Sequence, residues 1–77
     1  MSMNTVSTIK LEKEIEVTAK DVELVKLLSE SKTAQQIADE TGRNRRTVEA
    51  QIFAARRKYG VAGNAGLVLI FCRNGLI

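Results

Sequence analysis

The side chains best suited to binding chemistry in this chain are its arginines, and they are unevenly distributed. All six arginines lie between residues 43 and 73, whereas the basic residues of segment 1–32 are all lysines. Residues 1–32 carry five basic and six acidic side chains (net −1), and residues 33–77 carry seven basic and three acidic ones (net +4). Because a guanidinium group donates paired hydrogen bonds to phosphates and guanine edges, this asymmetry favours an anionic partner such as nucleic acid. A chance excess in so short a chain is the alternative.

The segment that would position these arginines has the pattern of two helices joined by a glycine turn. Thr33 and Gln36 have the spacing of a capping box that begins a helix over about residues 34–40. Gly42 permits the left-handed backbone of a tight helix end, and Asn44 can cap a second helix over about residues 45–59. Apolar residues recur along that second helix at spacings of four, three and four, at Val48, Ile52, Ala55 and Tyr59. This is the helix-turn-helix pattern, whose second helix can enter the DNA major groove.

The candidate DNA-binding residues are the outward side chains of the second helix and the residues at the two helix starts. A helix in the major groove contacts bases mainly with its N-terminal residues, so the expected base contacts are Arg46, Glu49, Ala50 and Phe53. Helix starts favour anions, so the expected phosphate contacts and their neighbours are Thr33, Arg43, Asn44, Arg45, Thr47 and Arg57.

Three of these assignments have a structural alternative. Phe53 could fold onto a neighbouring helix instead of standing free. Glu49 could pair with Arg45 or Arg46 and tune them. The triplet at residues 56–58, two arginines and a lysine, could serve only to stabilise the dipole at a helix C-terminus.

The N-terminal part of the chain is less readable. Ile9, Leu11, Ile15 and Val17 alternate as in a strand, but Lys13 breaks the alternation, and Leu11 and Ile15 would equally suit one face of a helix. Residues 1–16 are therefore expected to form an ordered extension of uncertain type, with about the first six residues loose. A domain over residues 17–77 would follow, opening with a capping box at residues 18 and 21 and a helix to about residue 29.

The C-terminal part predicts one more helix. Gly60 can end the second helix of the pair in a Schellman arrangement with residue 61, and Asn64 can cap a helix over about residues 65–74 that stops at Gly75. Residues 67–72 are all apolar, and one helix of so small a monomer cannot bury every side. This favours self-association through Leu67, Val68, Phe71 and Cys72; the alternative is that the N-terminal extension covers the extra face.

Composition argues against several classes of protein. The chain has no histidine, one cysteine, no cluster with metal-ligand spacing and no phosphate-cradling glycine loop, so we expect no enzyme, no metal and no cofactor. The longest apolar run is too short to span a bilayer, and the first eight residues have no signal-peptide character. The expectation is a cytoplasmic protein without membrane contact.

Residues 17–77 resemble the LuxR/GerE-type helix-turn-helix domain without a gap. The matching segments are Val17-Thr18, Val25-x-Leu27-Leu28, Gln36-Ile37-Ala38, Arg46-Thr47-Val48, Lys58-Tyr59-Gly60-Val61 and Gly75-Leu76-Ile77. Departures from the usual pattern include Ser31 in place of a glycine and Glu49 in place of a frequent lysine. The resemblance implies an all-α fold, a four-helix DNA-binding domain of a bacterial transcriptional regulator, here with a short N-terminal extension, as a stand-alone protein or as a fragment.

The same resemblance implies that the helix at about 45–59 lies in the major groove of double-stranded DNA and that the C-terminal helix commonly forms a homodimer contact. A sigma-factor region 4-like fragment is the alternative within the DNA-binding class. The alternative from another class is a protein-interaction module on a helix-turn-helix scaffold, which would bind RNA polymerase or a regulatory protein through residues such as Glu49 and Phe53.

Overall fold

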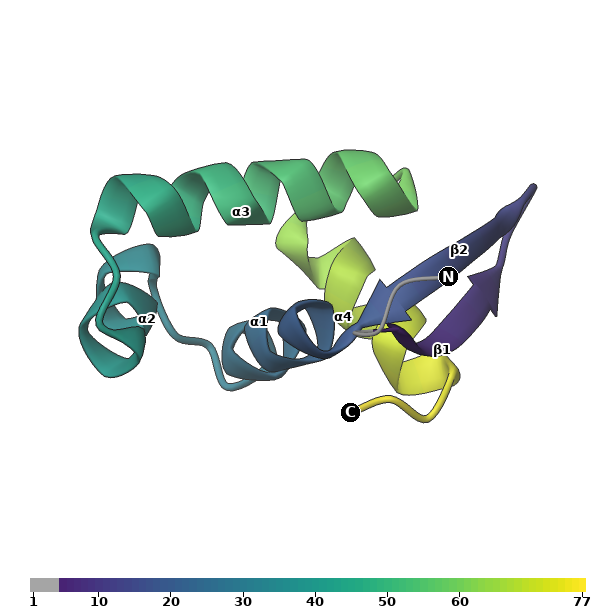
Figure 1. Ribbon diagram of the computed structural model, residues 1–77, viewed down its shortest axis with the longest axis horizontal. Coiled ribbons are helices and arrows are strands. Elements are labelled where there is room, and N and C mark those ends of the chain that lie inside the picture. Colours follow the sequence, from purple (N-terminus) through teal and green to yellow (C-terminus); the bar gives the residue numbers. More distant parts are fainter. Residues whose placement is uncertain (1–4) are drawn as a thin grey trace.

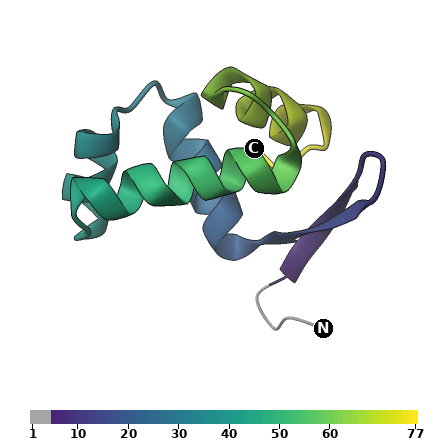
Figure 2. The ribbon, with the colours of Figure 1, turned by 90° about the horizontal axis from the view of Figure 1, so that it is seen from above.

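The computed structural model describes residues 5–77 and contains a β-hairpin followed by four helices (Figure 1). The elements are β1 (Thr5–Lys10), β2 (Glu14–Thr18), α1 (Ala19–Ser29), α2 (Ala34–Thr41), α3 (Arg45–Tyr59) and α4 (Asn64–Arg73). The long helix α3 runs along one side of the molecule, and α1, α2 and α4 all lie on its other side (Figures 1 and 2). One long face of α3 is therefore not covered by another element.

The expectation of an all-α fold is wrong, because the N-terminal segment forms a two-stranded antiparallel sheet. Ile9 pairs with Ile15 and Lys10 with Glu14, and residues 11–13 make the turn, where the Leu11 N–H donates to the Lys13 carbonyl at 3.1 Å. Lys13 interrupted the alternation of apolar residues because it lies in this turn between two strands, not within one strand. The expected loose start of about six residues is wrong for Thr5 and Val6, which belong to β1, and its remainder falls on residues 1–4, which lie outside the described residues.

The hairpin belongs to the same hydrophobic core as the helices. Ile9, Ile15 and Val17 are buried together with residues of all four helices. Strand β2 runs across the expected boundary between residues 16 and 17 and leads directly into α1 at Ala19. An isolated two-stranded hairpin is marginally stable in water, so this burial is what holds the strands in place.

The predicted helix caps are confirmed at five ends. Thr18 with Asp21 and Thr33 with Gln36 form complete capping boxes, and the Asn44 side chain accepts from the Thr47 N–H at 2.8 Å. The helices α2 and α3 end at glycines with left-handed φ values of 69° and 68°, at Gly42 and Gly60. The prediction for α4 is wrong at its start: the helix begins at Asn64 itself, and Gly63 precedes it without a side-chain cap.

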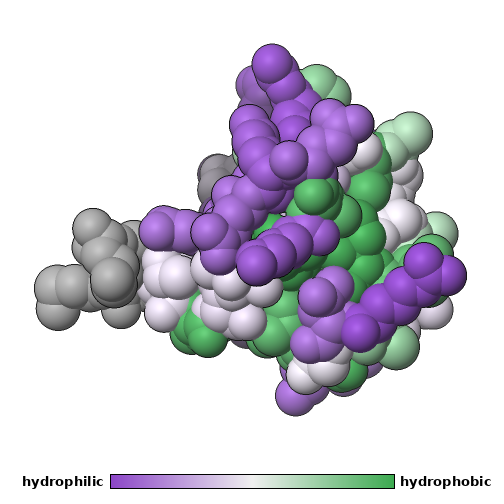
Figure 3. Space-filling view, turned by 90° about the vertical axis from the view of Figure 1, so that its right-hand side faces the viewer, coloured by the Kyte–Doolittle hydropathy of each residue, from purple (hydrophilic) through white to green (hydrophobic). Residues whose placement is uncertain are grey.

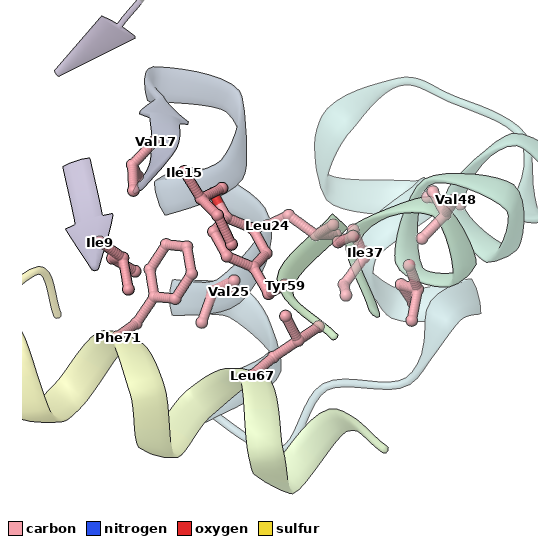
Figure 4. Packing of buried hydrophobic residues seen from close by; sticks show 13 residues of the cluster. Ile9, Ile15, Val17, Leu24, Val25, Ile37, Val48, Tyr59, Leu67 and Phe71 are labelled. Carbon is pink, nitrogen blue, oxygen red and sulfur yellow. The ribbon is translucent and has the colours of Figure 1, made fainter. Parts of the chain in front are cut away.

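The core is centred where α1, α3, α4 and the hairpin meet (Figure 4). The rings of Tyr59 and Phe71 meet edge to face, with their centroids 5.1 Å apart. Phe71 and Leu67 are completely buried, so their assignment to a dimer surface is wrong. Ile9 of the hairpin lies next to Phe71 (Figure 4), so the N-terminal segment covers part of the apolar face of α4.

No helix within residues 5–77 combines the length and the apolar character needed to cross a membrane.

Candidate functional site

The uncovered side of α3 carries a row of four exposed residues at spacings of four, three and four: Arg46, Ala50, Phe53 and Arg57. We call this row the outer face of α3. It lies opposite the buried row of the same helix, which packs against the other helices and consists of Val48, Ile52, Ala55 and Tyr59. Because 3.6 residues make one turn, the two rows occupy opposite sides of the helix along its whole length. The row contains two arginines and no acidic residue.

Arg46 is the arginine with the most freedom at the start of α3. Its neighbour Arg45 lies 3.7 Å (Nε to Oε2) from Glu49 one turn later, and Arg43 lies 3.5 Å from Glu23 of α1. Arg46 is exposed and makes no ion pair with any of residues 5–77. The pairing of Glu49 with Arg45 corresponds to the structural alternative for Glu49, and it leaves the positive charge of Arg46 uncompensated.

Phe53 stands free in the middle of the outer face of α3. Its side chain is 57% exposed, so it does not fold onto a neighbouring helix. The guanidinium carbons of Arg56 and Arg57 lie 6.0 and 5.9 Å from its ring centroid. These are distances at which a cation is attracted to the face of an aromatic ring. The ring and the two cations together form a surface that combines positive charge with an apolar centre.

The three basic residues at the end of α3 have different surroundings. Lys58 contacts Asp21 of α1 at 2.6 Å, and Arg56 donates to the Ala62 carbonyl at 3.4 Å. The side chain of Arg57 is exposed and has no hydrogen-bond or ion-pair partner in segment 5–77. A role in neutralising the helix end therefore fits Lys58 and Arg56 better, and Arg57 is the one available to a ligand.

Asp21 is a structural residue whose full role the sequence did not reveal. Its Oδ2 accepts from the Tyr59 hydroxyl at 2.7 Å, from Lys58 at 2.6 Å and from the Thr18 N–H at 3.2 Å. Burial alone would raise the pKa of Asp21, but the hydrogen bonds from Lys58, Tyr59 and Thr18 together lower it. Burial and the neighbouring carboxylate raise the pKa of Tyr59, so its hydroxyl remains a donor. The capping box indicated only the local contact to residue 18.

The side chains at the two helix starts are used as caps. The Thr33 hydroxyl accepts from the Gln36 N–H at 3.1 Å, and the Asn44 side chain accepts from the Thr47 N–H. Thr33, Asn44 and Thr47 are nevertheless all exposed. Thr33 also lines a groove that reaches Glu49 and Arg56 of α3, so the start of α2 and this flank of α3 border the same surface.

The exposed remainder of α4 is a narrower apolar surface than its sequence indicated. Val68 is half-buried, Leu69 is 50% exposed and Cys72 is exposed. Together with Leu28 of α1 they line a shallow groove of about 430 Å³. Of the four residues expected at a dimer contact, Val68 and Cys72 are therefore at the surface.

Comparison with protein-family models, with curated proteins and with solved structures gives no match for this chain. The assignment of a function therefore depends on the residues themselves and on their arrangement.

Proposed function

We propose that this chain is a DNA-binding transcriptional regulator that inserts α3 into the major groove. The observation that carries the proposal is the outer face of α3: an uncovered helix side on which Arg46, Ala50, Phe53 and Arg57 are all exposed. The opposite side of the same helix is filled by buried apolar residues, so the outer face is the side of α3 that is available to a partner.

The composition of this face suits a duplex. Arg46, in the first turn of α3, can donate paired hydrogen bonds to a guanine, and Ala50 and Phe53 can contact thymine methyl groups. Arg57, near the other end, suits a phosphate. The pairing of α2 and α3 across the Gly42 turn and the resemblance of residues 17–77 to LuxR/GerE-type domains support the same proposal. Apart from residues 17 and 18 at the end of β2, the β-hairpin is not part of that resemblance.

Replacing Arg46 with alanine is expected to weaken DNA binding. If Arg46 reads a guanine, the loss is about 1–3 kcal/mol on the cognate site and small on a scrambled duplex. If it contacts a phosphate, both duplexes lose affinity and the slope of log K against log salt falls by about one in magnitude. The measurement is fluorescence anisotropy at several salt concentrations, on a duplex selected from a random pool and on its scrambled version.

Arg73→Ala is the matched control, because it removes the same charge from an exposed position in the last turn of α4. A loss equal to that of Arg46→Ala would mean that only the net charge matters. Unchanged binding by Arg46→Ala would remove this residue from the interface, and a wild-type protein that ignores duplex at low salt would refute the proposed function.

We further propose that the protein acts as a homodimer through Val68, Leu69 and Cys72 of α4. Two copies would place their α3 helices on half-sites about one helical turn apart. Val68→Glu is expected to convert a dimer to a monomer in sedimentation equilibrium and to weaken binding to inverted-repeat DNA, since it puts a charge into the contact. A wild type that is monomeric and still binds the inverted repeat normally would contradict this.

A second candidate is a protein-interaction module, and the exposure of Phe53 beside two arginines favours it. Aromatic residues and arginines are enriched where proteins bind one another tightly. The partner would then be RNA polymerase or another regulatory protein. Phe53→Ala separates the two functions: it would abolish such a complex, whereas DNA binding without sequence preference would persist through the arginines.

A further inference from the structure

We infer that the turn of the β-hairpin, residues 11–13, is a second contact to the duplex, and that the groove between this turn and the end of α3 receives the sugar-phosphate backbone. This inference deepens the proposed function and rests on it. The groove has a volume of about 680 Å³ and is lined on one side by the hairpin and on the other by the last residues of α3. Its lining residues are Leu11, Glu12, Lys13, Ile15, Arg57, Lys58, Tyr59 and Gly60.

The hairpin is held rigidly enough to act as a fixed arm. Ile9 and Ile15 pair across the two strands, and both are buried in the core together with Val17. The strands extend beyond the C-terminal end of α3, so the turn projects past the helix (Figures 1 and 2). The core therefore anchors the strands up to the pair Ile9–Ile15 near the turn and leaves Leu11, which is 48% exposed, at the tip. A contact made by a preorganised arm costs little ordering entropy on binding.

Each wall of the groove carries one positive side chain without an ion-pair partner in the described part of the chain, and the equally unpaired Glu12 on the hairpin brings the sum of these three free charges to +1. Lys13 on the hairpin and Arg57 on α3 are exposed and have no ion-pair partner in the described part of the chain. Lys58 is paired with Asp21, so its charge is already compensated. Glu12 is the acidic side chain of the lining. Hydrophilic side chains border an apolar floor at this end of the molecule (Figure 3).

The end of α3 repels a phosphate less than a fully open helix C-terminus would, because two of its terminal carbonyls have partners. The carbonyls of Arg56 and Arg57 accept from the N–H groups of Val61 and Gly60 at 2.9 and 3.3 Å. These two bonds close the Schellman motif and satisfy the carbonyls that would otherwise present negative partial charge. The positive charge of Arg57 is therefore less offset by the negative partial charge of the helix end, and it remains available to a phosphate.

The groove is continuous with the outer face of α3, because Arg57 belongs to both. A helix of fifteen residues is about 22 Å long, whereas the major groove is about 12 Å wide. If α3 enters the major groove at an angle with its first turns, the last turn reaches past the edge of the groove to the strand backbone. The hairpin turn lies beyond the C-terminal end of α3. The groove between the two would therefore face the phosphates of the same duplex.

The test uses a mixed-sequence 24-base-pair duplex, because phosphate contacts do not depend on sequence. Lys13→Ala is expected to bind this duplex about three- to tenfold more weakly than the wild type at low salt and to reduce the magnitude of the salt slope by about one. Lys26→Ala is the matched control, since Lys26 is exposed on α1 and lies outside the groove. Thermal unfolding of both variants should match that of the wild type.

The position of the hairpin turn on the duplex is tested separately. In a Cys72→Ser protein, the variant Glu12→Cys supplies a single cysteine to which a DNA-cleaving iron chelate is attached. Strand cleavage from this site, but not from Lys26→Cys in the same background, is expected. If the wild type and Arg46→Ala differ in binding while Lys13→Ala behaves as Lys26→Ala does, the hairpin contact is refuted and the proposed function stands. If the wild type does not bind duplex, both are refuted.

Discussion

Replacing Phe71 with alanine is expected to lower the free energy of unfolding by about 3–5 kcal/mol. Phe71 has no exposed surface and packs against Tyr59, so its removal leaves a cavity where α3, α4 and the hairpin meet. At roughly 0.05–0.15 kcal/mol per residue, a domain of 77 residues has a total stability of about 4–12 kcal/mol, so the variant should lose a large part of it. Urea denaturation followed by circular dichroism measures the change.

Leu69→Ala is the control on the same helix. Because Leu69 is half-exposed, its replacement should lower the free energy of unfolding much less than that of Phe71. The comparison also separates core from interface. If Phe71→Ala kept its stability and lost only self-association, Phe71 would be an interface residue, and the packing described for α4 would be incorrect.

Replacing Asp21 with asparagine is expected to lower the free energy of unfolding at pH 7 by about 1–3 kcal/mol, since the carboxylate accepts three hydrogen bonds that an amide oxygen would accept more weakly. Tyr59 is the reason the effect should exceed that of a surface ion pair. Tyr59 is almost completely buried, so its hydroxyl needs the Asp21 carboxylate as a hydrogen-bond acceptor. The asparagine has nearly the same shape, so the loss reports the charge and its hydrogen bonds.

The effect should depend on pH in a definite direction. The pKa of Asp21 in the folded protein lies below its ordinary value of 3.8. The folded state therefore favours the ionised form, and its stabilising contribution is complete above about pH 5 and lost as the pH falls through the folded pKa. The difference between wild type and Asp21→Asn should shrink below about pH 4.

Asp39→Asn is the control for this titration, because Asp39 is exposed on α2 and accepts from Gln35 of the same helix. Its stability difference from the wild type should stay small over the whole pH range. A constant difference for Asp21→Asn between pH 7 and pH 3 would show that the ionised carboxylate is not the stabilising species.

Local sequence determined the helical part of this protein. The capping residues Thr18, Thr33 and Asn44 and the glycines at residues 42 and 60 act on backbone groups a few residues away, so their effect can be derived from spacing alone. The position of α3, its buried row and its exposed row followed from the same local periodicity. Ser31, which takes a left-handed φ of 63°, stands where related patterns usually have glycine.

Tertiary structure decided how the apolar residues divide between core and surface. Leu67 and Phe71 have the same apolar character as Leu69, and nothing in their types separates core from surface. The separation depends on the hairpin, whose burial of Ile9 against the C-terminal helix joins residues about sixty positions apart. The contacts of Asp21 with Lys58 and Tyr59 also join residues far apart along the chain, at separations of 37 and 38 positions.

The sequence by itself therefore determined four helices, the N-caps of α1, α2 and α3 and an arginine-bearing outer row on α3, because each depends on interactions within a few residues. It did not determine the hairpin or the groove beside α3. A strand is stabilised by its partner and by the core it covers, and periodicity over residues 9–17 does not specify where the turn falls. Only the folded chain brings Lys13 and Arg57 to the same groove.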